Sequence, residues 1–288
     1  MIRFVALAAL LSLTPLLAGC DGALGSDDGR PRVVASFYPL QYVAERVAGD
    51  HTEIVNLTTP GAEPHDLELS VRQTAEISEA DLVFYQEGLQ PAADDAVEQN
   101  QPERVVETTE TMPLESDDPH FWLDPTRLSE VAVAFTDEMT DLDPEHAEAY
   151  RANLDDLRSD LADLDRDFEE GLAGCAVDTV VVSHDAFGYL GRRYDLDIHP
   201  IAGLSPDAEP SPAHIQELHE LIESDGITTV FSETLASPEM SETIANDLGI
   251  ESAVLDPVEG LSDSDSDEDY LSLMRSNLAA LRKANQCP

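Results

Sequence analysis

The sequence predicts an α/β protein with two lobes, each a four-stranded parallel sheet flanked by helices, joined by one long rigid helix. From residue 32 onward, short runs rich in valine and isoleucine alternate with helical patterns. Such β-branched runs favour buried parallel strands, and their alternation with helices predicts βαβ units. Because four runs precede one long amphipathic stretch and four follow it, we expect two lobes.

The N-terminal lobe is expected over residues 32–143 and the C-terminal lobe over residues 174–288. Strands of the first lobe are expected at residues 32–37, 53–57, 81–85 and 104–107. Strands of the second lobe are expected at residues 179–183, 197–201, 228–232 and 252–255. Helices are expected between them, for example at residues 70–78, 211–223 and 238–248.

The linking helix is expected over residues 144–173, where apolar residues recur at helical spacing among many charged residues. Pro144 suits a first helical turn with Asp143 as its N-cap, and glycines at 171 and 174 suit the exit. Such a rod would be roughly 40 Å long and would resist hinge bending. Two helices broken in the middle are the alternative, although no proline or glycine interrupts residues 145–170.

The N-terminus has the pattern of a targeting segment. Residues 1–20 begin with Arg3, continue through an apolar run that is short for a membrane span, and end in Leu-Ala-Gly-Cys. This ending resembles a lipobox, so we expect cleavage before Cys20 and lipidation of Cys20. The alternative is an ordinary secretory signal with an incidental cysteine. Residues 21–31 are polar and glycine-rich, which is typical of a flexible tether, and the mature protein is expected on the outer face of the cell membrane.

The charge balance excludes one class of partner. The chain has 60 acidic residues against 15 lysines and arginines, a formal net charge of −45. Such a surface repels phosphates, so nucleic-acid binding is disfavoured. The charge could attract cations, but acids spread along the whole chain are also typical of a solvated surface adapted to high salt.

Two cysteines remain in the body, Cys175 and Cys287. Outside the cytosol disulfides persist, and two cysteines allow one internal pairing. We therefore hypothesise a Cys175–Cys287 disulfide that ties the C-terminal helix to the start of the second lobe. Free or metal-binding thiols are the alternative.

Three of the eight histidines follow expected strands in turn-like sequence: His65, His120 and His184. Asp256 follows the last expected strand. Ligands of open parallel sheets bind beyond the carboxyl ends of the strands, so two facing lobes could close these four side chains around one ion. Three imidazoles and a carboxylate suit tetrahedral Zn²⁺. By spacing alone the pattern is weak, because a histidine at a strand end is more often structural.

The amino-acid sequences of the segments around these residues strengthen the prediction of a metal site. From residue 33 onward the chain resembles the metal-binding proteins of ABC importers for zinc and manganese, the ZnuA/TroA family. The matching stretches are GAEPHDLELS (61–70), ADLVFY (80–85), DPHFWLDP (118–125), VSHDAFGYLG (182–191), GLSPDAEPSP (203–212) and VLDPVEG (254–260).

The resemblance implies two α/β lobes, a rigid linking helix and a metal buried between the lobes. It implies His65, His120 and His184 as ligands, with Asp256 fourth. Manganese-binding members carry glutamate at the third position, so His184 favours Zn²⁺. It also implies a monomeric, non-catalytic binding protein that delivers the ion to a membrane permease.

The sequence departs from the family in one region and leaves alternatives open. Residues 112–119 (MPLESDDP) are short and acidic where many zinc-binding members have a histidine-rich loop. Glu63 is a candidate substitute for Asp256, and Glu233 could support a ligand, since metal-bound histidines donate their other N–H to such a partner.

The remaining alternatives are functional. They are a Mn²⁺-binding component of the same transporter class, a zinc-dependent hydrolase, for which an open coordination position would be required, and a surface adhesin.

The acidic run at residues 262–269 lacks the glycine and bidentate glutamate of an EF-hand, so we expect a solvated loop there.

Overall fold

The computed structural model describes residues 29–115, 118–264 and 267–288. The expected signal peptide, the lipidation site Cys20 and most of the tether lie outside these residues. Within the described part of the chain, no helix combines the length and the apolar character needed to cross a membrane. Residues 31–288 form one compact unit.

The four strands expected in the N-terminal half are present and parallel. They are β1 (Arg32–Ala35), β2 (Glu53–Asn56), β3 (Leu82–Tyr85) and β4 (Val105–Glu107), in the order β2-β1-β3-β4. The helices are α1 (Tyr38–Ala48), α2 (Val71–Glu79), α3 (Pro91–Asn100), α4 (Thr108–Thr111) and α5 (Pro125–Leu142). Helix α2 begins one residue after its expected start, because Ser70 is its N-cap and forms a capping box with Gln73.

The C-terminal half repeats the same topology. Its strands are β5 (Thr179–Val182), β6 (Asp197–Pro200), β7 (Thr229–Ser232) and β8 (Glu251–Val254), in the order β6-β5-β7-β8 and all parallel. Its helices are α7 (Gly188–Tyr194), α8 (Pro212–Asp225), α9 (Glu239–Leu248) and α10 (Tyr270–Ala284). The predicted fold class of two parallel four-stranded sheets is therefore confirmed.

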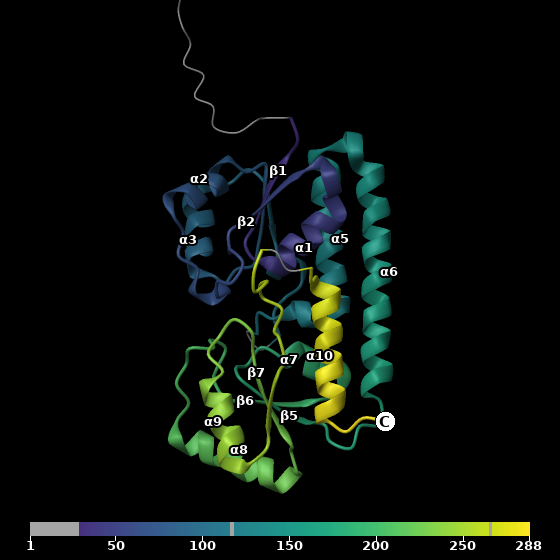
Figure 1. The fold of residues 1–288 in the computed structure, drawn as a ribbon. Helices are drawn as coiled ribbons and strands as arrows, with labels where there is room; N and C mark the ends of the chain where they lie inside the picture. Colours follow the sequence, from purple (N-terminus) through teal and green to yellow (C-terminus); the bar gives the residue numbers. More distant parts are fainter. Residues whose placement is uncertain (1–28, 116–117, 265–266) are drawn as a thin grey trace, which may run out of the picture. The chain divides into compact units, whose positions relative to one another are not determined.

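One long helix, α6 (Ala147–Leu172), follows the N-terminal sheet and its helices. It packs against α1 and α5 of the N-terminal half and against α7 and α10 of the C-terminal half. Figure 1 shows it running beside α5 and α10. Its apolar stripe is buried: Tyr150, Leu154, Leu157, Leu161, Leu164, Phe168 and Leu172. At 26 residues it is about 39 Å long.

The start of this helix differs from the prediction. Residues Pro144–His146 form a separate 3₁₀ turn, and the side chain of Asp143 caps no backbone N–H. Its carboxylate instead accepts hydrogen bonds from the His146 ring and the Tyr150 hydroxyl, both at 2.7 Å. Those two contacts compete with N-capping, so the α-helix begins at Ala147.

The two sheets share a large hydrophobic cluster, and each sheet also has a smaller cluster of its own. A single buried cluster contains Phe37 and Trp122 from the N-terminal half together with Phe187 and Tyr270 from the C-terminal half. The Tyr270 hydroxyl also donates to the Trp122 carbonyl. Close packing across this boundary opposes large separation of the lobes.

The disulfide between Cys175 and Cys287 is present. It joins the segment after α6 to the residues after α10. Because 112 residues separate the two cysteines, the bond stabilises the fold by roughly 4–5 kcal/mol in the chain-entropy treatment.

Candidate metal site

Each candidate histidine sits in a short turn that fixes its backbone. His65 lies in the 3₁₀ turn Pro64–Asp66, which follows β2, and the Glu63 side chain caps this turn by accepting from the His65 N–H at 3.2 Å. Glu63 is thus a neighbour of the ligand candidate His65.

His120 is held by Asp118. One oxygen of the Asp118 carboxylate contacts both the His120 backbone N–H, at 3.0 Å, and His120 Nδ1, at 2.9 Å. A carboxylate only accepts, so Nδ1 carries the proton and Nε2 faces the centre of the site. Sequence reasoning did not single out Asp118, although the acid two residues before the histidine was a usable signal.

His184 follows β5 and is held in the same manner from a neighbouring strand. Its Nδ1 lies 2.9 Å from Glu233 Oε1, and Glu233 follows β7. Both side chains are almost fully buried. The structure therefore places Glu233 where it supports a ligand candidate rather than in the group itself.

The fourth member of the group is Glu259, a residue that sequence reasoning missed. Among the described residues, His65, His120, His184 and Glu259 form a group whose ligand atoms all lie within 4.8 Å of one another. Glu259 lies in the predicted motif VLDPVEG, so its sequence context carried the signal.

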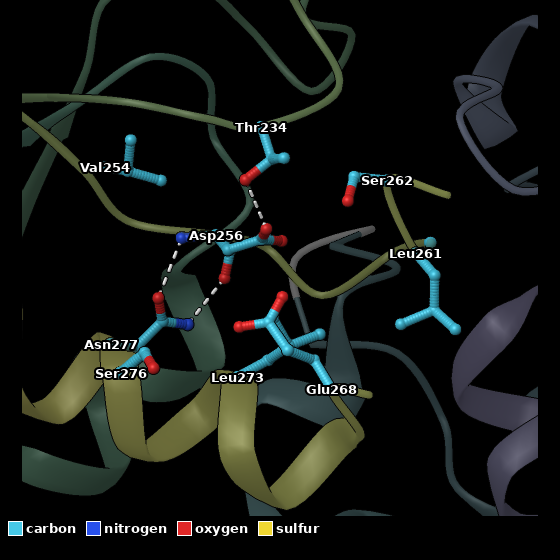
Figure 2. Close-up of a pocket in the computed structure, with 10 residues that line it drawn as sticks. Thr234, Val254, Asp256, Leu261, Ser262, Glu268, Leu273, Ser276 and Asn277 are labelled. Atoms are coloured by element: carbon cyan, nitrogen blue, oxygen red, sulfur yellow. Dashed lines mark hydrogen bonds between the residues drawn. The ribbon is translucent and has the colours of Figure 1, made fainter. Parts of the chain in front are cut away.

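Asp256, the predicted fourth ligand, is not brought into this group. Its Oδ2 accepts from the Thr234 hydroxyl and its Oδ1 from the Val258 N–H at 2.7 Å. Figure 2 shows Asp256 between Thr234 and Asn277 of α10. One carboxylate oxygen is thus held by a side chain and the other by the backbone, and the group contains Glu259, three residues later, in place of the expected Asp256.

Four of the six distances between ligand atoms of the group are close to those of a tetrahedral zinc site. Glu259 Oε1 lies 3.6 Å from His65 Nε2, 3.2 Å from His120 Nε2 and 3.4 Å from His184 Nε2. His65 Nε2 and His120 Nε2 are 3.4 Å apart. Ligand atoms at zinc's usual bond lengths stand about 3.3–3.4 Å apart at the corners of a tetrahedron.

Three of the atoms that face the centre have no hydrogen-bond partner within the described residues. His184 Nε2 and both oxygens of Glu259 are buried without one, and His120, His184 and Glu259 are 0%, 0% and 1% exposed. A buried carboxylate without donors is costly. The donor set therefore fits a cation held at the centre.

The electrostatics of the group favour positive charge. Burial alone would lower the pKa of His184, but Glu233 and Glu259 outweigh it and raise that pKa to about 10. The pKa of His120 is likewise raised by Asp118 and Glu259 against its burial. The pKa of Glu259 would be raised by its burial, yet contact with the three imidazoles holds it well below its usual range. Without an ion, protons supply the positive charge that the carboxylates demand.

Glu63 stays near the group without joining it. Burial first, and then the negative charge of Glu259, raise the pKa of Glu63 to about 8. Its carboxyl is thus largely protonated at neutral pH. Its backbone capping role at His65 accounts for its position.

Two acids of the stretch at residues 112–119, Glu115 and Asp118, connect the two halves through Arg192. Glu115 accepts from Arg192 Nε at 2.9 Å, and Asp118 lies 3.4 Å from Arg192 Nη2. Gly188 makes this approach possible, because a Cβ there would lie 2.4 Å from Asp118 Oδ2.

Known proteins are similar to this chain in sequence and in fold. The sequence model of the family described as "Zinc-uptake complex component A periplasmic" matches residues 33–284. The high-affinity zinc uptake system protein ZnuA of Bacillus subtilis is 30% identical over 296 residues, covering 93% of each chain. The zinc-binding lipoprotein AdcA of Streptococcus pneumoniae is 31% identical over 301 residues, which is 96% of this chain but only 60% of AdcA. The chain therefore spans about 60% of the length of that relative.

Solved structures agree with this similarity. The laminin-binding protein Lmb of Streptococcus agalactiae, described as having adhesin and metal-transporting activity, matches with a TM-score of 0.81 at 30% identity, covering 88% of this chain and 99% of that one. The Zn(II)-bound ZnuA-like domain of S. pneumoniae AdcA matches with a TM-score of 0.78 at 31% identity, covering 89% and 99%.

Proposed function

Because the chain belongs to the family of periplasmic zinc-uptake component A proteins, we propose that it captures Zn²⁺ outside the cytoplasm and passes it to the permease of an ABC importer. The observation that carries the proposal is the convergence of three imidazole nitrogens and one carboxylate oxygen on a single buried point. The zinc-binding names of its relatives support the choice of cargo.

Zinc is favoured over manganese by the chemistry of the four donors. Imidazole nitrogens suit Zn²⁺, whereas Mn²⁺ prefers a shell of oxygen ligands and a higher coordination number. The group offers three nitrogens and one glutamate, at spacings close to those of a zinc tetrahedron. Asp118 and Glu233 fix the ring orientation of two of the histidines, which makes the nitrogens better donors.

Capture and release follow from how the donors are distributed. His65 and His120 come from the N-terminal half, and His184 and Glu259 from the C-terminal half. Either half alone supplies only two ligands, so high affinity requires both. Delivery to the permease then requires one pair to withdraw, and the shared core limits this movement to loops and small lobe shifts.

A binding role fits the site better than hydrolysis. Catalytic zinc sites keep one position open for water, while the four donors here would complete a tetrahedral shell. We further propose that the mature protein acts as a monomer, anchored to the outer face of the cell membrane through lipidated Cys20.

The test is a metal titration of residues 31–288 after removal of bound metal. We expect one Zn²⁺ per chain with nanomolar affinity, about −12 kcal/mol, and much weaker Mn²⁺ binding. His184→Ala should weaken zinc binding severely. His199→Ala, on β6 and outside the group, is the matched control and should bind as the unmodified protein does. Preference for Mn²⁺, or an unaffected His184→Ala variant, would refute the proposal.

A further inference from the structure

The residue before the glutamate of the site has an unusual backbone conformation. Val258 has a φ of +57° and is fully buried. Left-handed φ values are rare for β-branched residues because Cβ crowds the backbone. Such a conformation persists only when surrounding contacts enforce it, so the contacts around Val258 must hold the chain in this turn.

The first set of contacts comes from the C-terminal half. Asp256 Oδ1 accepts the Val258 N–H at 2.7 Å, and the Thr234 hydroxyl donates to the other oxygen. Asn277 of α10 fixes the backbone of Asp256 from both sides, because its Oδ1 accepts the Asp256 N–H at 2.8 Å and its Nδ2 donates to the Asp256 carbonyl at 2.6 Å. Figure 2 shows Asp256 held between these two partners.

The second set comes from the N-terminal half. Trp122 Nε1 donates to the Pro257 carbonyl at 2.7 Å, and the Gly61 N–H donates to the Leu261 carbonyl at 2.7 Å. Gly61 and Trp122 belong to the two segments that carry His65 and His120. The segment of residues 256–261 is thus fastened on both sides of Glu259 and to both halves of the molecule.

We propose that Asp256 is a positioning residue that holds the left-handed turn at Val258 and thereby aims Glu259 at the three histidines. The inference rests on the proposed zinc-binding function. Both carboxylate oxygens of Asp256 are already engaged, so the side chain shapes the path of the chain and does not touch the ion. The turn sets the backbone position from which Glu259 reaches the three imidazoles, whose Nε2 atoms lie 3.2–3.6 Å from its Oε1.

Two substitutions separate positioning from ligation. Asp256→Asn keeps the geometry, since its Oδ1 still accepts the Val258 N–H and its amide N–H can donate to the Thr234 hydroxyl. It is a poor replacement for a carboxylate metal ligand. Asp256→Ala removes both hydrogen bonds and frees the turn. If Asp256 is a positioning residue, Asp256→Asn should retain most of the zinc affinity that Asp256→Ala loses. If Asp256 is a metal ligand, both variants should bind zinc weakly.

The experiment measures Zn²⁺ affinity by chelator competition, and the visible absorption of the Co²⁺-loaded protein, for residues 31–288. The variants are Asp256→Ala, Asp256→Asn and Glu259→Gln, with Ser276→Ala as the control on the exposed neighbouring position of α10. We expect Asp256→Ala to weaken zinc binding on the order of 10–100-fold, as loss of an outer support does. Its Co²⁺ spectrum should also change, because a misplaced Glu259 lets water into the coordination shell.

Asp256→Asn should recover most of the lost affinity and the four-coordinate Co²⁺ spectrum, and Ser276→Ala should change neither. Unchanged affinity in Asp256→Ala overturns the inference, as does an Asp256→Asn variant as weak as Glu259→Gln. If Asp256→Ala does not fold, the comparison of Asp256→Asn with Glu259→Gln decides alone. Failure of the unmodified protein to bind zinc would refute the proposed function, whereas failure of these variants to differ would refute only the positioning role.

Discussion

Zinc capture by this site should release protons, and the number follows from the pKa values in the group. The proton release depends on the pH at which zinc is added. His184, with its pKa raised to about 10, is protonated at pH 7 and must lose that proton to bind the ion. His120, whose pKa is also raised, adds up to a second.

The loss of zinc affinity on acidification should be larger for this site than for a site whose histidines have ordinary pKa values. Each proton displaced lowers zinc affinity about tenfold per pH unit of acidification. His184 alone therefore predicts about a tenfold loss between pH 7 and pH 6, and His120 brings the loss toward a hundredfold. Three histidines with a pKa near ~6.5 would together release under about one proton at pH 7.

The folding stability of the metal-free protein depends on pH in the opposite direction to the zinc affinity. A folded-state pKa of His184 near 10 contributes stability that is fully present below the unfolded value of ~6.5 and is lost as the pH rises toward 10. The metal-free protein should thus become less stable over this window, while zinc binding becomes stronger.

Titration calorimetry in buffers of different ionisation enthalpy counts the released protons. We expect between one and two per zinc at pH 7. Glu233→Gln removes the carboxylate that supports His184 and should reduce this number. Release of less than about one proton by the unmodified protein, as expected from three histidines with an ordinary pKa near ~6.5, would contradict the raised pKa values.

Two further predictions concern the supports of the site. Replacing Cys175 and Cys287 by serine should remove roughly 4–5 kcal/mol and lower Tm by about 10 °C in thermal unfolding followed by circular dichroism; an unchanged Tm would contradict the stabilising role of the disulfide. Gly188→Ala places a Cβ 2.4 Å from Asp118 Oδ2, so it should displace the carboxylate that orients His120 and weaken zinc binding on the order of 10–100-fold. Chelator competition measures that loss, and full affinity would show that Asp118 tolerates displacement.

The fold could be predicted because its signals are local. The run Thr179–Val182 is fully buried and β-branched, and such runs identify parallel strands without tertiary information. The start of α6 was less predictable. Asp143 and Pro144 have the pattern of an N-cap and a first turn, but the nearby His146 ring and Tyr150 hydroxyl bind the Asp143 carboxylate instead.

The histidines could be predicted for a related reason. Strand ends and turn sequence placed His65, His120 and His184 at one edge of each sheet. The choice between Asp256 and Glu259 could not be made this way. Both lie in one short loop, and the left-handed backbone of Val258 decides which carboxylate turns inward.

That backbone depends on contacts distant in sequence. Asn277 is 21 residues away from Asp256, and Trp122 is 135 residues away from Pro257. No local sequence pattern encodes such contacts, so the turn cannot be predicted from a single sequence.

The most direct measurement is a crystal structure of the zinc-loaded protein with anomalous data collected at the zinc edge. We predict one zinc ion, bound at about 2.0–2.2 Å by Nε2 of His65, His120 and His184 and by a carboxylate oxygen of Glu259, with Asp256 still hydrogen-bonded to Val258. A zinc ion bound by Asp256, or one bound outside the three histidines, would contradict it.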